Sequence, residues 1–153
     1  MATVTPAEIR AWVATWLESL TSVTLREAPR VGGVDGEASS VAHGSFSVVM
    51  ADETDLGQMR QRPGGGTRVR QTVIVRFAWR LRPGADQLTD YDAALEAGRA
   101  IVRKMIARPT TGALPIHVMY EGTPNRIEMD GGKWLLTDVR FSIDHILDLS
   151  AVA

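Results

Sequence analysis

The sequence contains no cysteine, which excludes disulfide bonds, thiolate nucleophiles and cysteine-based metal sites. It has no apolar run near the roughly 20 residues that a membrane-spanning helix needs. Its first residues lack the basic start and apolar stretch of a secretory signal, so no signal peptide is expected. Lysine is scarce, because only Lys104 and Lys133 occur among the 17 basic residues. The chain is thus compatible with a reducing compartment, and arginine carries nearly all of its positive charge.

What remains is the composition of an ordinary globular protein. The chain has 153 residues, of which 44% are hydrophobic and 23% charged. That length is typical of one domain and is enough to bury a sizeable core. We find no internal repeat, so residues 1–153 are interpreted as a single domain.

One stretch, RVRQTVIVRFAWRLRP at residues 68–83, divides into two sets when every second residue is read. Side chains alternate between faces along a strand, so this pattern predicts a long strand with one apolar face and one face carrying five arginines. The apolar set is Val69, Gln71, Val73, Val75, Phe77, Trp79 and Leu81. The basic set is Arg68, Arg70, Thr72, Ile74, Arg76, Ala78, Arg80 and Arg82.

Two amphipathic helices are predicted. The first begins where Thr5 can cap, Pro6 suits the first helical position and Glu8 can complete a capping box. The second is predicted to begin at a cap on Thr89 or Asp90 and to continue to about residue 107, before Pro109. Gly98 lies on its apolar stripe, which predicts a close approach of helix and sheet. The predicted core is Trp12, Trp16, Val73, Val75, Phe77, Leu95, Ile101, Val139 and Phe141.

The remaining segments predict further strands and two long connections. Residues 26–44 are rich in glycine, proline and serine and are interpreted as a loop that can hold a short strand. Residues 52–67 are interpreted as a long mobile arm between two strands. Asp130-Gly131-Gly132 is a strong hairpin turn. Strands are predicted at 45–51, 68–82, 116–120, 126–129 and 133–144. The order of elements predicts an α+β fold with a mostly antiparallel twisted sheet, and with an N-terminal and a central helix on one face.

No familiar catalytic pattern accompanies this fold. His43, His117 and His145 lie far apart without metal-ligand spacing, and the glycines at 64–66 lack the Lys and Ser/Thr of a phosphate-binding loop. Asp144-His145 with Asp148 suggests a base and its orienting carboxylate, but no nucleophile accompanies them. We therefore expect no enzyme activity, no cofactor and no metal.

Charge is unevenly distributed along the chain. Residues 56–82 contain seven arginines and no acid, whereas residues 121–148 contain six acids against three basic residues. Such asymmetry fits self-association between unlike surfaces and also fits binding to nucleic acid. A solvated strand face remains the third interpretation. For nucleic acid, Phe77 and Trp79 fall in the set opposite the arginines, and no helix-turn-helix, zinc-finger or RRM signature is present.

The order of elements resembles that of a known family. An amphipathic N-terminal helix precedes two long strands joined by a basic arm, then a helix of the form DYDAALEAGRAIVRKMI, then a hairpin that ends in KWLLTDVRFSIDHILDL. This arrangement, over nearly the whole chain, resembles the tail terminator (tail-completion) proteins of long-tailed bacteriophages and phage-tail-like particles. That family has no catalytic motif that could be carried over to single residues.

The resemblance implies a structural virion protein. It implies a hexameric ring at the head-proximal end of the tail, assembled in the bacterial host cytoplasm, that ends tail-tube polymerisation and joins the tail to the head connector. Its partners would be further copies of the chain, the tail tube protein and the connector, with DNA passing through the lumen unread and no membrane involved. The alternative is a small nucleic-acid-binding module that uses the arginine-rich strand and arm.

A ring requires two different surfaces on each subunit, one meeting the other on its neighbour. The basic strand and the acidic C-terminal hairpin are the candidate surfaces, and the arm is expected to become ordered on docking. We expect Arg70, Arg76 and Arg80 to contact acids of a neighbouring subunit or of the next ring. The predicted interface residues are Arg60, Arg62, Arg68, Arg70, Arg76, Arg80, Asp138 and Asp144.

Overall fold

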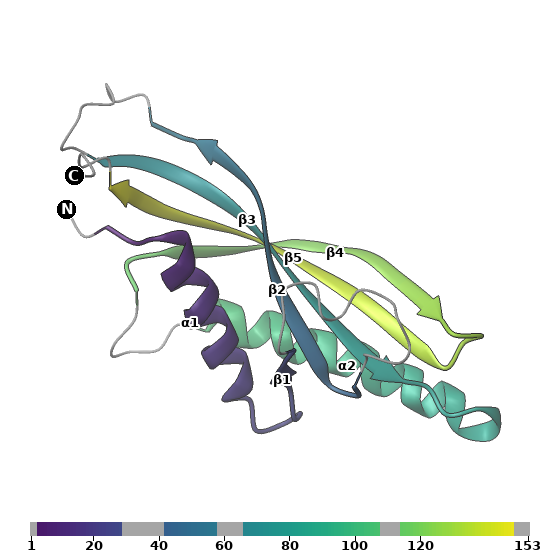
Figure 1. Ribbon diagram of the computed structural model, residues 1–153. Helices are drawn as coiled ribbons and strands as arrows, with labels where there is room; N and C mark the ends of the chain where they lie inside the picture. Colours follow the sequence, from purple (N-terminus) through teal and green to yellow (C-terminus); the bar gives the residue numbers. More distant parts are fainter. Residues whose placement is uncertain (1–2, 29–41, 58–65, 108–113, 149–153) are drawn as a thin grey trace.

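The computed structural model describes residues 3–28, 42–57, 66–107 and 114–148. These residues form an α+β fold, as predicted: a five-stranded sheet with two α-helices (Figure 1). The strand order is β1-β2-β3-β5-β4, and every pairing is antiparallel except that of β1 with β2. The elements in chain order are α1 (Pro6–Glu18), β1 (Arg26–Glu27), β2 (Ser45–Asp55), β3 (Gly66–Arg80), the short 3-10 helix η1 (Gly84–Asp86), α2 (Gln87–Ile106), β4 (His117–Met129) and β5 (Trp134–Asp148).

The centre of the sheet is the pair β3 and β5. Each is 15 residues long, and they pair without interruption from Gly66 opposite Asp148 to Arg80 opposite Trp134. Neither strand contains proline, and both are rich in β-branched and aromatic residues that favour extended backbone. The other long strands pair with this centre, β2 with β3 and β4 with β5.

Both helices pack on the same face of this sheet, where the main core lies (Figure 1). The apolar set of β3 faces the helices, and Val75 and Phe77 are completely buried there. Gly98 of α2 lies over the Phe77 ring, although an added Cβ would approach that ring only to an ordinary contact of 3.6 Å. Of the predicted core, the fully buried members are Val73, Val75, Phe77, Ile101, Val139 and Phe141.

Trp12, Trp16 and Leu95 are partly rather than completely buried, and the two tryptophans pack against the core. Trp16 lies at the seam between α1 and α2 rather than inside the core. Its indole Nε1 donates a hydrogen bond to the Lys104 carbonyl at 2.7 Å, and the Lys104 ammonium sits 3.8 Å above its ring. A tryptophan needs a partner for its N–H, and a seam supplies one where an apolar core cannot.

The local signals for the first helix and the last turn are confirmed. Thr5 and Glu8 form the reciprocal capping box, and Pro6 occupies the first turn of α1. Asp130, Gly131 and Gly132 all have positive φ angles, of 53°, 65° and 82°. Glycine adopts these angles without strain, which is why the turn falls at this place.

The predicted start of α2 is wrong. The helix begins at Gln87 after η1, its cap residue Asp86 makes no side-chain capping bond, and Asp90 lies within the first turn. Asp90 does not cap because its carboxylate binds Arg82 instead. A contact between elements has thus replaced the local cap that the sequence pattern favours.

Three strands, β2, β4 and β5, are longer than predicted, whereas β3 has the predicted length but lies two residues earlier, at Gly66–Arg80. The segments 116–120 and 126–129 belong to one strand, β4, which passes through two register irregularities beside Gly122. Gly122 has a φ of 115°, which only glycine adopts readily, and Pro124 is tolerated because β4 is an edge strand. Likewise β2 extends to Asp55 and β3 starts at Gly66, so both ends of the predicted arm at 52–67 are strand. Residues 58–65 of that arm lie outside the described residues.

Candidate interface on the helix-free sheet face

The candidate site is the sheet face opposite the two helices, which we call the helix-free face. The basic set of β3 points to it, and the β5 residues directly opposite that set point the same way. The side chains of β3 on this face are Arg68, Arg70, Thr72, Ile74, Arg76, Ala78 and Arg80. Those of β5 are Trp134, Leu136, Asp138, Arg140, Ser142, Asp144 and Ile146.

Arg76 and Asp138 form an ion pair across β3 and β5. The Nε and Nη2 groups of Arg76 donate to the two carboxylate oxygens of Asp138 at 2.7 and 3.0 Å. The Asp138 side chain is 6% exposed and that of Arg76 is 34% exposed. The carboxylate is thus buried against the sheet while the guanidinium lies between it and the surroundings. Such a paired geometry offsets the cost of burying the acid.

Arg70 and Asp144 repeat this arrangement further along the same two strands. Arg70 donates from Nε and Nη2 to the Asp144 oxygens at 2.8 and 3.1 Å, and Arg68 approaches the same carboxylate at 3.6 Å. The hydrogen bonds from Arg70 hold the pKa of Asp144 below its usual value, although burial opposes this shift. The same bonds raise the pKa of Arg70. Both groups therefore remain charged at neutral pH.

These two pairs give Arg70 and Arg76 acidic partners within their own chain, whereas the predicted partners were acids of a neighbouring subunit or of the next ring. The basic strand and the acidic hairpin are not separate surfaces, because β5 lies directly beside β3 and places each acid opposite an arginine. The spacing gives a physical reason: Arg70 and Arg76 are six residues apart, as are Asp138 and Asp144, so one antiparallel register matches both pairs.

Two cations of this face have no acidic partner among the described residues. Arg140 lies on β5 between Asp138 and Asp144, is exposed, and stands opposite Gly122, which has no side chain to cover it. Arg80, one of the predicted interface residues, is also exposed at the end of β3. The sequence reasoning missed Arg140, although its place in the alternation of β5 was a visible signal. Arg60 and Arg62 lie outside the described residues.

The end of the helix-free face near the β4–β5 turn is apolar. Ala78 and Leu136 are buried there, and Ala28, Met129 and Trp134 pack against them half-buried. Further along β4, the Ile127 side chain is opposite Leu136 and is 53% exposed. The face therefore combines an apolar end with a row of ordered ion pairs.

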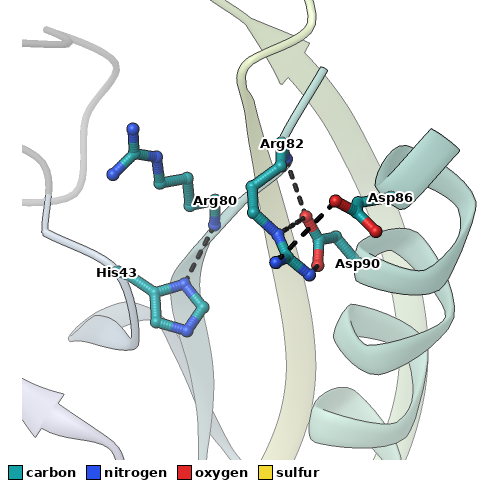
Figure 2. Close-up of polar contacts among 5 residues, drawn as sticks. All are labelled: His43, Arg80, Arg82, Asp86 and Asp90. Atoms are coloured by element: carbon teal, nitrogen blue, oxygen red, sulfur yellow. Dashed lines mark hydrogen bonds and ion pairs between the residues drawn. The ribbon is translucent and has the colours of Figure 1, made fainter. Parts of the chain in front are cut away.

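A second polar cluster joins the end of β3 to the start of α2 (Figure 2). Asp90 accepts from the backbone N–H of Arg82 at 2.7 Å and from its Nε and Nη2 at 3.0 and 2.9 Å. These bonds lower the pKa of Asp90 to about 2, and those from the Arg82 side chain have the largest effect. Figure 2 shows the Arg80 guanidinium pointing away from this cluster. Arg82 is thus an anchor for α2.

His43 binds the end of β3 two residues before Arg82 (Figure 2). Its Nδ1 accepts a hydrogen bond from the Arg80 backbone N–H at 3.1 Å, and its ring packs edge-on against Trp79 at 4.4 Å. Partial burial lowers its pKa, against the opposing effect of Asp90. His43, Trp79 and Arg80 line a hollow of about 400 Å³ with Arg82, Asp90 and Ala93. The geometry favours a neutral imidazole that orders the end of the strand.

The suggested base and carboxylate at Asp144-His145 do not come together. Adjacent residues of a strand face opposite sides, so Asp144 lies on the helix-free face and His145 on the helix side. His145 is buried at 3% exposure, and neither of its ring nitrogens has a hydrogen-bond partner in the described part of the chain. Across the parts of the chain that the structure describes, no three His, Cys, Asp or Glu side chains gather as a metal site.

Two further findings bear on the class of protein. No helix within the described ranges combines the length and the apolar character needed to cross a membrane. Comparison with models of known protein families gives no match, and comparison with curated proteins gives none either.

Proposed function

We propose that the chain is a structural assembly protein that forms a ring, of the kind that ends a phage tail tube and joins it to the head connector. The observation that carries this proposal is the helix-free face. Its acids are fixed by cross-strand pairs, its cations point outwards, and apolar side chains lie beside them. A surface that is ordered, partly apolar and partly charged suits docking to another protein.

The order of elements supports the same proposal. The α1, β2–β3, α2, β4–β5 arrangement is the one on which the resemblance to tail terminator proteins depends, and the fold has it. In this proposal the ring contains six copies, sits at the head-proximal end of the virion tail, and lets DNA pass without reading its sequence. Arg68, Arg70, Arg76, Arg80, Asp138 and Asp144 would lie in or beside the contacts of the ring. No cofactor and no membrane enters this scheme.

The decisive experiment measures the mass of the purified chain in solution and images its particles by electron microscopy. Native mass spectrometry or sedimentation is expected to show a closed oligomer of about six subunits, and negative stain is expected to show rings. Adding the protein to polymerising tail tubes of its own particle is expected to shorten them, because a terminator caps the growing end. Tubes of unchanged length and a chain that stays monomeric beside them would contradict the proposal.

A nucleic-acid-binding module is the second candidate, and one observation favours it. Arg140 and Arg80 are exposed cations without acidic partners in the described residues, as phosphate contacts require. This candidate predicts tight binding of short DNA duplexes at low salt, with affinity that falls steeply as salt rises. It requires no ring, so the mass measurement separates the two candidates.

A further inference from the structure

We propose that a groove between α2 and β4 binds a carboxylate side chain of a partner protein. The groove lies on the helix side of the sheet and encloses about 140 Å³. Its lining includes Leu95, Gly98 and Arg99 of α2 and Tyr120, Thr123 and Arg126 of β4. This surface is separate from the helix-free face, and its proposed role does not depend on the ring.

The lining of the groove carries positive charge, and no Asp or Glu of the described residues belongs to it. Arg99 and Arg126 are exposed, one on each wall, and neither forms an ion pair within the described residues. Three other hollows formed by described residues each include an acid, which is Asp90, Asp144 or Glu96. Two cations that line one hollow repel each other, and an anion bound between them offsets that repulsion. The groove therefore has the electrostatic character of an anion site.

The wall on β4 exists because this strand is irregular. Tyr120, Thr123 and Arg126 are spaced by three residues, so in a regular strand Thr123 would face the opposite side from the other two. The register of β4 on β5 shifts on both sides of Gly122, between Tyr120 and Asn125, and Gly122 has a φ of 115°. These shifts allow all three residues to line the same groove. Irregularities of this kind redirect side chains and are common beside functional sites.

The β4 wall also offers a hydrogen-bond donor. The Tyr120 ring packs against Phe141 with their centroids 5.9 Å apart, which holds its position. The Tyr120 and Thr123 hydroxyl oxygens lie 2.9 Å apart and share one hydrogen bond, in which either can be the donor. Each hydroxyl has one proton, so the one that accepts in this bond keeps its own O–H to donate to a ligand. An anion in the groove can thus be bound by a hydroxyl as well as by the arginines.

A single carboxylate fits the groove better than a nucleic-acid backbone does. Glu121 and Glu128 are exposed on the same strand as Arg126 and would repel a chain of phosphates. The enclosed volume is small, and Leu95 gives its α2 wall an apolar surface. Such a groove suits the short apolar stem of a Glu or Asp side chain, whose carboxylate arginine binds with paired hydrogen bonds.

The residue types in the groove indicate that the carboxylate belongs to a protein. Tyr120 is 44% exposed beside the two arginines. Tyrosine and arginine are among the side chains that contribute most to contacts between proteins, particularly where they border a pocket. The occupant is therefore an acidic side chain on the surface of a partner.

The test titrates the full chain with two short peptides that differ in one side chain, acetyl-Gly-Glu-Gly-amide and acetyl-Gly-Gln-Gly-amide. NMR follows the Nε–H signals of the arginines. The glutamate peptide is expected to shift the signals of Arg99 and Arg126 with a Kd on the order of 1 mM. The glutamine peptide has the same shape without the charge and is expected to leave both signals in place.

Three variants and a control locate the binding. Arg99→Gln and Arg126→Gln are each expected to weaken binding of the glutamate peptide by about fivefold. Tyr120→Phe keeps the ring but removes a hydroxyl, and is expected to weaken it by about twofold. The control, Arg103→Gln, changes an exposed arginine of α2 that lines a different hollow and is expected to bind as the wild type does. Circular dichroism checks that all four remain folded.

Three outcomes would overturn the proposal. Equal shifts from the two peptides would show that the groove does not recognise charge, and binding that survives both Arg99→Gln and Arg126→Gln would place the anion elsewhere. Inorganic phosphate that binds at these two arginines at least about tenfold more tightly than the glutamate peptide would assign the groove to a phosphoryl group. The mass measurement of the proposed ring is independent of these titrations, so either proposal can fail while the other stands.

Discussion

The same strands form both faces of the sheet, but different interactions stabilise each face. The helix-covered face is closed by completely buried apolar side chains such as Val75, Phe77 and Phe141. The helix-free face buries carboxylates instead and covers them with arginines that remain about one-third exposed or more. On the covered face the free energy of folding comes from removing apolar surface from water. On the helix-free face, burial of Ala78 and Leu136 contributes at one end, and the matched charges contribute a smaller net amount.

The two faces of one strand can therefore carry different chemistry. The apolar set of β3 specifies the core, and the alternating set is then free to carry a chemistry that the core does not need. The pairing of Arg76 with Asp138 and of Arg70 with Asp144 fixes the direction in which each guanidinium lies. Arginines held in this way lose less conformational entropy on docking than free ones, which favours their use in a contact between proteins.

The largest expected effect comes from truncating a buried side chain on the helix-covered face. Phe77→Ala removes a completely buried ring beneath α2 and is expected to lower the free energy of unfolding by about 3–5 kcal/mol. Ile74→Ala, the neighbouring truncation on the helix-free face, removes a half-buried side chain and is expected to cost at most about 2 kcal/mol. Urea unfolding monitored by tryptophan fluorescence measures both. Equal losses in the free energy of unfolding would show that side chains on the two faces contribute equally to stability.

The next effect comes from the ion pairs of the helix-free face. Asp138→Ala removes the carboxylate that binds the half-buried Arg76 guanidinium and is expected to cost about 1–3 kcal/mol. Arg140→Ala removes an exposed cation with no partner on the same strand and is expected to change stability by less than about 0.5 kcal/mol. A double-mutant cycle with Arg76→Ala isolates the coupling. A coupling of zero would mean that the pair positions side chains without stabilising the monomer.

Much of the covered face could be predicted from the sequence, because its signals are local. Each of these signals depends on neighbours in sequence. They are the capping box at Thr5 and Glu8, the β4–β5 turn at Gly131 and Gly132, and the alternation around Phe77. Local signals failed where a distant partner competed for the same group. Asp90 looked like a helix cap, but Arg82 binds it from the preceding strand end.

The helix-free face could be predicted only in part, because strand order is not a local property. The alternation placed Arg70 and Arg76 on one face correctly, but their pairing depends on β5 lying beside β3. The matching intervals on the two strands were a signal for that register, since Asp138 and Asp144 repeat the spacing of the arginines. Charge totals by segment pointed to separate surfaces instead, because they ignore which strands are neighbours.

The seam between α1 and α2 allows a test with a smaller expected loss of stability. Trp16→Phe keeps most of the apolar ring but removes the N–H that binds the Lys104 carbonyl, and is expected to cost about 1 kcal/mol. Trp12→Phe is the matched change, because Trp12 stacks beside Trp16 and its N–H has no bond within the described residues. A smaller loss is expected for Trp12, measured by urea unfolding. If Trp12→Phe costs as much, the seam depends on ring area rather than on the hydrogen bond.

The smallest expected effect is on stability at low pH. It acts through the contact of Arg82 with Asp90, which anchors α2 to the end of β3. Hydrogen bonds from Arg82 lower the pKa of Asp90 from 3.8 to about 2 in the folded protein. Between these values the unfolded chain binds the proton more readily, so the stability that this group contributes is complete above about pH 4 and is lost as pH falls towards 2. Asp144, whose pKa is also lowered, adds a loss of the same sign.

Asp90→Asn removes the ionisable group from this link, so unfolding midpoints in urea are expected to fall less steeply between pH 4 and pH 2 than in the wild type. Asp92→Asn, two residues further along α2, is the matched control, since Asp92 is exposed and forms no ion pair with any residue that the structure describes. It is expected to retain the wild-type slope. The effect stays small because Arg82 itself is more than half exposed, where solvent screens the pair. Parallel pH profiles for wild type and Asp90→Asn would show that the charge of Asp90 adds no stability and that Arg82 holds the start of α2 through its backbone N–H alone.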